Sequence, residues 1–200
     1  MNDLAHSEEY RGYTLKIHYD QDPESPREWS NLSIIACYHP RYHLGDYNRK
    51  GKPQFPSKNE VEEIIGNKST VWLPLYLYDH SGITMNTTGF SCPWDSGQVG
   101  WIYATKEVLD KEYGKGKWKR EEVERVLKGE VEVYDQFLTG QVYGYTIEDE
   151  EGDEIDDSCW GLYGEDYAIS EAKSVIDYQI TKKEKDAVAW KNDNQLEMAL

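Results

Sequence analysis

The sequence has few cysteines and no long apolar run, and both absences narrow the class of protein. Its three cysteines, Cys37, Cys92 and Cys159, are an odd number at wide spacing, which suits a reducing compartment better than a disulfide framework. No stretch approaches the roughly 18 to 20 apolar residues of a membrane-spanning helix. The first nine residues also lack the basic start and the apolar centre of a signal peptide. We therefore expect a cytoplasmic protein.

Motifs for binding nucleotides or nucleic acid are absent too. The sequence contains no Walker loop, no glycine-rich dinucleotide fingerprint and no RNA-recognition signature. Its basic patch, Lys115–Arg120, is too short to indicate a nucleic-acid site in so acidic a chain. We expect no direct binding to nucleic acid or to a membrane, and no cofactor.

Acidic residues dominate the last third of the chain. The formal net charge is -16, and residues 129–200 contain 19 acids against 5 bases. Such a field repels nucleic acid and anionic membranes, and it attracts cations or a basic protein surface. The densest part is the acidic tract, residues 148–157, with eight acids and no base. We predict that a partner binds to these acids and to two aromatic residues that follow them: Glu148, Asp149, Glu150, Glu151, Asp153, Glu154, Asp156, Asp157, Trp160 and Tyr163.

The acidic tract resembles a calcium-binding loop only superficially. It lacks the alternation of oxygen ligands around a central glycine, and it lacks a closing bidentate glutamate at the expected distance. A solvated hairpin tip is the commoner meaning of such a run.

The apolar pattern predicts an α+β fold in which one antiparallel sheet packs with three or four helices. The 26 aromatic residues are more than a disordered acidic chain would contain. We expect a single domain over residues 1–180, followed by a C-terminal helix or frayed tail over 181–200. Alternating or β-rich segments predict strands at 13–19, 32–38, 71–78, 98–103, 141–147 and 158–163. Helical spacing predicts helices at 59–66, capped by Asn59, and at 105–113, 121–138 and 166–180.

Two residue groups could carry chemistry. Cys37, His39 and His43 supply donors that zinc accepts, although no second pair follows at zinc-finger spacing and Cys37 stands in an apolar strand. Cys92 with His80 and an orienting Asp79 or Asp95 would suit a cysteine nucleophile. The alternatives are that Cys37 and Cys92 pack as small apolar side chains and that the histidines are loop residues.

Four phrases of the sequence resemble a family of small, uncharacterised proteins of bacteriophages and mobile elements. The phrases are Asp22–Trp29, Leu73–Gly82, Ser91–Gly100 and Asp157–Gly161, and the likeness spans about residues 19–178. The resemblance implies a phage or prophage origin. It implies no activity, cofactor or site residue.

Charge and resemblance together lead to one main functional hypothesis. Carboxylates can occupy the Lys/Arg channel of a nucleic-acid enzyme, because the counterion release that drives DNA binding also drives binding of an acidic protein. We therefore predict an acidic inhibitor of a host defence nuclease, of the anti-CRISPR or anti-restriction kind, acting as a nucleic-acid mimic. One alternative is a small cysteine- or metal-dependent enzyme that acts on a small molecule or nucleotide. The other is a virion or host-takeover scaffold without inhibitory activity. If the region 79–103 recognises the partner, the acidic tract would only tune the affinity for it.

Overall fold

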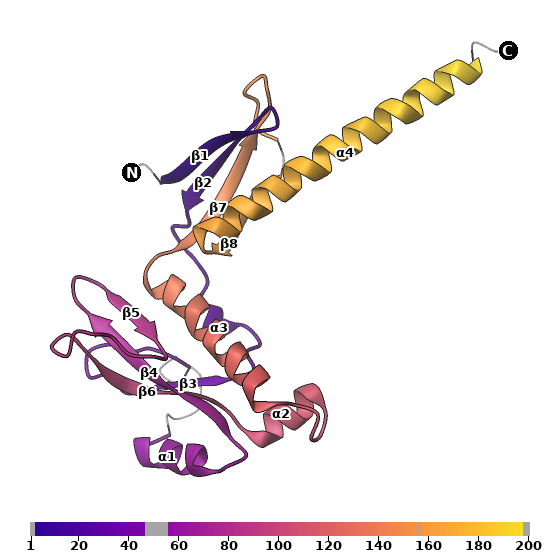
Figure 1. Ribbon diagram of the computed structural model, residues 1–200. Helices are drawn as coiled ribbons and strands as arrows, with labels where there is room; N and C mark the ends of the chain where they lie inside the picture. The colour runs from indigo at the N-terminus through magenta and orange to yellow at the C-terminus, as the bar shows by residue number, and fades with distance from the viewer. Residues whose placement is uncertain (1–2, 47–55, 156, 198–200) are drawn as a thin grey trace. The chain divides into compact units, whose positions relative to one another are not determined.

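The computed structural model describes the backbone of residues 3–46, 56–155 and 157–197, and the side chains as far as residue 190. Within these residues the chain forms four α-helices and eight strands (Figure 1). This confirms the predicted α+β class and the antiparallel pairing. The strands, however, belong to two four-stranded sheets, whereas the sequence pattern predicted one.

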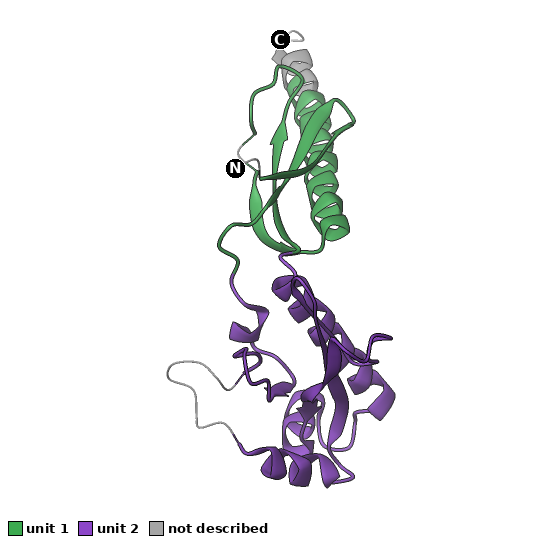
Figure 2. Cartoon of the chain, turned by 90° about the vertical axis from the view of Figure 1, so that its left-hand side faces the viewer, with its two compact units in different colours: residues 1–23, 141–200 green, residues 24–140 purple. Residues whose placement is uncertain are grey.

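The two sheets lie in different compact units (Figure 2). Unit 1 comprises residues 1–23 and 141–200, and unit 2 comprises residues 24–140. Each unit has a hydrophobic core of its own. The single domain expected over residues 1–180 stays a prediction.

Unit 1 brings the two ends of the chain into one antiparallel sheet. Strand β1 is at one edge and β8 at the other, in the order β1 (Leu4–Tyr10), β2 (Tyr13–Tyr19), β7 (Val142–Glu148), β8 (Cys159–Tyr163). Apolar and polar residues alternate along β2, so Leu15 and Ile17 are buried while Lys16 faces the other side. The mostly polar sequence of β1, with a bulge in its pairing between Leu4 and His6, explains why no strand is predicted there.

Helix α4 (Glu165–Glu197) covers one face of this sheet. Ala168, Ala172 and Ile176 recur every four residues and are fully buried against the strands. Residues 181–190 are exposed, and Figure 1 shows the C-terminal half of α4 running past the end of the sheet.

Unit 2 is built around the second sheet, and α3 (Arg120–Leu138) packs across one face of it. Helical spacing predicts one apolar face along this helix, formed by Val123, Val126, Leu127, Val131, Tyr134, Phe137 and Leu138. Val123, Leu127, Val131 and Tyr134 are buried, whereas Val126 is 38% exposed. Helix α1 (Lys58–Gly66) inserts Val61 against the other face. The remaining elements are the strands, in the order β3 (Ile34–Cys37), β6 (Ser96–Ala104), β4 (Val71–Asp79), β5 (Ile83–Asn86), together with the 3-10 helix η1 (Pro26–Glu28) and α2 (Lys106–Tyr113).

One local prediction, the capping residue of α1, is corrected by the structure. Ser57, not Asn59, caps α1, because the Ser57 hydroxyl accepts from the Glu60 N–H at 3.3 Å and the Glu60 carboxylate accepts from the Ser57 N–H at 2.6 Å. The polar stretch 79–97 contains β5, which pairs with β4.

None of the helices in the described part of the chain has the length and apolar content that crossing a membrane requires.

Candidate functional site

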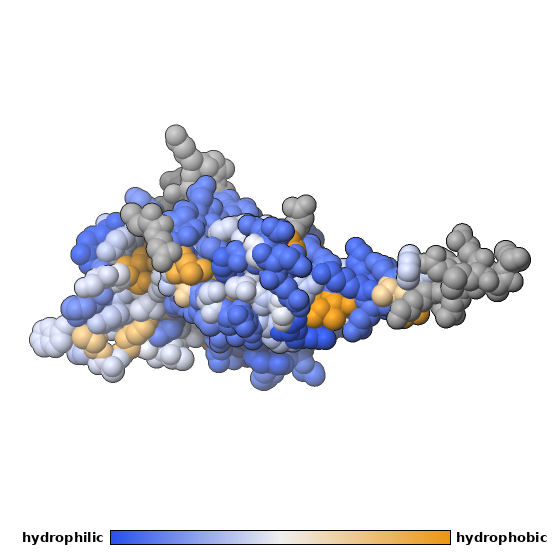
Figure 3. Space-filling view, turned by 90° about the horizontal axis from the view of Figure 1, so that it is seen from above, coloured by the Kyte–Doolittle hydropathy of each residue, from blue (hydrophilic) through white to orange (hydrophobic). Residues whose placement is uncertain are grey.

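Acidic residues are concentrated in unit 1. This unit has 21 acids against 7 bases, a net charge of -14, whereas unit 2 has 17 against 15, a net charge of -2. The fold adds the N-terminal hairpin, with five acids and two bases over residues 1–23, to the acidic residues 141–200. Figure 3 shows hydrophilic residues over most of the visible surface, interrupted by small apolar patches.

The acidic tract forms the connection between β7 and β8, as predicted, and its tip is an ordered turn. The Asp149 carboxylate accepts hydrogen bonds from the backbone N–H groups of Glu151 and Asp153, at 3.1 and 3.0 Å. The Asp149 N–H donates to the Asp153 carbonyl at 2.9 Å, and Gly152 adopts a positive φ of 86°. Asp149 therefore has a structural role in the turn, and its carboxylate points inward to the backbone.

The remaining acids of the tract differ in how far they are compensated. Glu148 pairs with Lys16 on β2, and Asp157 accepts a hydrogen bond from Gln179 on α4. Asp156 lies outside the described residues. Four exposed acids make no ion pair among the described residues: Glu150, Glu151, Asp153 and Glu154.

The charges of the acidic tract also affect the pKa of a lysine on α4. The Lys183 ammonium donates to the Tyr13 hydroxyl at 2.9 Å. This hydrogen bond, and to a smaller extent the charges of Asp149 and Glu151, raise the pKa of Lys183. Of the eight acids that the sequence identifies, Asp149 and Glu148 make contacts within unit 1, whereas Glu150, Glu151, Asp153 and Glu154 are exposed without an ion pair among the described residues.

Trp160, one of the two predicted aromatic contacts, lies across β7 on the side away from α4. A Cβ atom at Gly144 would be 2.3 Å from carbon atoms of the indole, and the His18 ring lies 6.0 Å from it, centroid to centroid. The residue is 47% exposed, so its outer ring face is accessible. Tyr163, the other predicted contact, is half-buried in β8.

The structure brings the three residues of the enzymatic alternative together around Asp95. The Asp95 Oδ2 atom lies 3.3 Å from His80 Nδ1 and accepts a hydrogen bond from the Cys92 thiol at 3.7 Å. In the described part of the chain, His80 and Cys92 thus share a carboxylate and form no direct Cys–His pair of the kind that activates a thiol. His80 stacks on Tyr78, with 6.0 Å between the ring centroids.

The structure does not bring Cys37, His39 and His43 together as a set of metal ligands. Among the described residues, no three His, Cys, Asp or Glu side chains are placed to hold a metal ion. Cys37 is packed in the core of unit 2, where burial raises the pKa of its thiol to about 12, although metal binding requires the thiolate. His39 Nδ1 accepts the N–H groups of Arg41 and Tyr42, both at 3.3 Å, and His43 is exposed.

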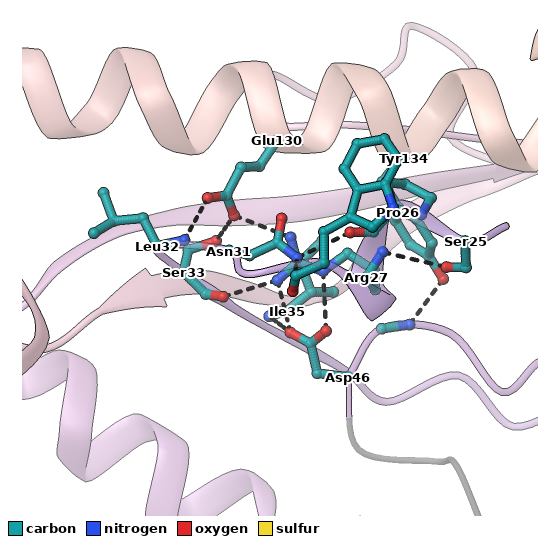
Figure 4. Close-up of polar contacts among 12 residues, drawn as sticks. Ser25, Pro26, Arg27, Asn31, Leu32, Ser33, Ile35, Asp46, Glu130 and Tyr134 are labelled. Carbon is teal, nitrogen blue, oxygen red and sulfur yellow. Dashed lines mark hydrogen bonds and ion pairs between the residues drawn. The ribbon is translucent and has the colours of Figure 1, made fainter. Parts of the chain in front are cut away.

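A buried ion cluster in unit 2 is the principal polar feature that the sequence pattern does not predict (Figure 4). Arg27, only 4% exposed, donates to both carboxylate oxygens of Asp46, at 2.9 and 2.8 Å, and to Glu130 at 3.0 Å. Its fourth hydrogen bond, at 2.8 Å, goes to the carbonyl of Ser33. Burial opposes the charged form of Arg27, but the hydrogen bonds and charges of Asp46 and then Glu130 outweigh it and raise the pKa of the guanidinium.

The cluster ties together segments distant in sequence. Glu130 on α3 also accepts from the Leu32 N–H at 2.8 Å and from the Ser33 hydroxyl, and Asp46 accepts from the Ile35 N–H at 2.6 Å. Within unit 2 the guanidinium thus uses four of its five N–H donors, and each carboxylate accepts three hydrogen bonds. We assign the cluster a structural role. Arg27, which belongs to the phrase Asp22–Trp29, has this role.

The chain matches no family model, no curated protein and no solved structure. Its candidate functional surface is therefore interpreted from the chemistry of its own residues.

Proposed function

We propose that this chain is a phage-type accessory protein that binds a basic surface of a host nucleic-acid-processing defence enzyme and inhibits it. The enzyme would be a nuclease of a CRISPR or restriction system in the host cytoplasm. Unit 1 is the binding module, and the acidic hairpin is its principal contact.

The observation that carries the proposal is the charge of unit 1. A net charge of -14 on 83 residues repels phosphate backbones and attracts lysine- and arginine-rich surfaces. So large an excess of negative charge destabilises a compact unit, because the like charges repel one another. Association with a cationic partner would offset this destabilisation.

The geometry of the hairpin suits this role. The Asp149 turn fixes the backbone on which Glu150, Glu151, Asp153 and Glu154 stand, so their binding requires no ordering of this backbone and only the side chains lose freedom. Trp160 offers a large, partly exposed ring on the same sheet, and tryptophan is enriched among residues that dominate interface energies.

The test is binding to a guide-loaded CRISPR effector nuclease and to a restriction enzyme across a salt series. We expect association to slow as salt rises, because screening shortens the reach of surface charges to about 8 Å at physiological ionic strength. A variant with lysine at Glu150, Glu151, Asp153 and Glu154 should associate about tenfold more slowly at low salt and lose inhibition.

The matched control reverses four exposed acids of unit 2, Glu62, Glu63, Glu112 and Glu132. It changes the net charge by the same amount, so a hairpin-specific contact predicts a much smaller effect. Binding that ignores salt, or equal losses in the two variants, would contradict the proposal, as would failure to bind either class of nuclease.

A further inference from the structure

Unit 2 contains a pocket of about 270 Å³ that shares no residue with the acidic hairpin. It lies between the loop after β3 and the paired ends of β4 and β6. Its apolar floor includes Leu77 and Val99, and its polar lining includes His39, Arg41, Asp79 and Asp95. The volume is slightly below that of ordinary drug-sized sites, so it fits a single side chain or a small molecule.

The charges of the lining favour a cation. Arg41 is ion-paired with Asp79, which also accepts from the Tyr42 hydroxyl at 3.1 Å. Asp95 has only His80 and Cys92 as side-chain partners among the described residues, and both contact Oδ2. Its Oδ1 atom therefore remains available as an acceptor. An incoming anion would meet two carboxylates and one guanidinium that is already paired.

Trp94 adds a second recognition element to the same pocket. The residue is 92% exposed and directly precedes Asp95 in the chain. The Trp94 indole therefore packs little against the rest of unit 2. Among the described residues, it makes no ring stacking or cation–π contact. A cation over its face gains cation–π attraction, and a planar guanidinium can also stack there. A compact ammonium is more strongly hydrated and gains less from this combination.

We propose that this pocket binds an alkylguanidinium group, with Trp94 stacking on its plane and Asp95 accepting its hydrogen bonds. The group would belong either to an arginine of a partner protein or to a free guanidine. The inference stands apart from the proposed function, because its residues lie in the nearly neutral unit and its test needs no nuclease.

The test is a titration of the intact protein with N-acetylarginine amide at constant ionic strength, followed by NMR through the backbone amide peaks of residues 94–99. We expect saturable shifts that the neutral isostere N-acetylcitrulline amide does not produce. Asp95→Asn and Trp94→Ala should each weaken binding about fivefold to tenfold, whereas Glu63→Gln on exposed α1 should leave it unchanged.

Two further probes complete the experiment. Butylguanidinium binding as tightly as an arginine-containing peptide would assign a free guanidine, and tighter binding of the peptide would assign a protein side chain. Equal shifts with the citrulline compound, unchanged affinity in both pocket variants, or a saturable response to inorganic phosphate instead would each overturn the proposal. Whether the hairpin variant loses nuclease binding has no bearing on the outcome of these titrations.

Discussion

Replacing Arg27 by methionine tests the buried ion cluster most directly. The substitution keeps an unbranched side chain of similar reach but removes the cation that Asp46 and Glu130 share. The carboxylates of Asp46 and Glu130, whose side chains are 17% and 13% exposed, are then left largely buried without their charged partner. Removing one member of a buried ion pair generally costs about 3–5 kcal/mol, because the remaining charge stays desolvated.

The structure places the expected cost at the lower end of that range. Arg27 loses four hydrogen bonds, but Asp46 keeps the Ile35 N–H and Glu130 keeps the Leu32 N–H. We therefore expect a loss of about 3 kcal/mol in the free energy of unfolding. The pKa of Arg27 is raised in the folded protein, so its contribution is present below its unfolded pKa and is lost only as the pH rises through the folded value. The cost should stay constant across neutral and mildly alkaline pH.

Urea unfolding followed by circular dichroism measures this cost. With a urea dependence of about 2 kcal/mol per molar, the unfolding midpoint of unit 2 should fall by roughly 1.5 M. Arg125→Met, at an exposed site on α3, is the control and should change stability by less than about 0.5 kcal/mol. If Arg27→Met costs no more than the control, the assignment of a structural role to the cluster is wrong.

Three other predictions follow from particular contacts. Gly144→Ala would place a Cβ atom 2.3 Å from the Trp160 ring and should cost about 1–3 kcal/mol in urea unfolding; adding Trp160→Ala should relieve most of this overpacking cost, and simple additivity would contradict the contact. Hydrogen bonds from a neighbouring lysine and then a tryptophan lower the pKa of Asp110 to about 2. Its stabilisation is therefore present above the unfolded pKa near 3.8 and is lost as pH falls through about 2, so the thermal midpoints of wild type and Asp110→Asn should differ at neutral pH and converge in acid. In thiol labelling of the native protein, exposed Cys159 should react quickly and Cys37, buried with a pKa of about 12, only on unfolding; equal rates would contradict the burial.

Segments with strong local signals could be predicted from the sequence. Alternation gave β2 with its observed bounds of Tyr13–Tyr19. The apolar spacing of α3 identified its four buried residues but also included Val126, which is exposed. Strand β1 could not be found this way, because its pairing with β2 stabilises a polar segment that has no strand pattern. The α1 cap was misplaced by two residues, since the reciprocal bonds of Ser57 and Glu60 decide the start of the helix.

For the candidate sites, residue types were predictable and roles were not. The tract of eight acids is plain in the sequence, but hydrogen bonding within the turn makes Asp149 structural and leaves four neighbours as presented charge. His80, Cys92 and Asp95 were grouped by their chemistry, and only the structure shows that Asp95 lies between the other two.

By itself the sequence determined the α+β class, the large negative charge and the position of the acidic hairpin, because propensity, periodicity and charge are properties of contiguous residues. Tertiary structure alone decided that the N-terminal hairpin joins the acidic residues 141–200 in one unit. It also decided that Arg27 is buried between two carboxylates, and that Trp94 and Asp95 line a pocket with Arg41. These features depend on contacts between segments far apart in the chain, and the burial that gives each charge its energy arises only when those segments pack.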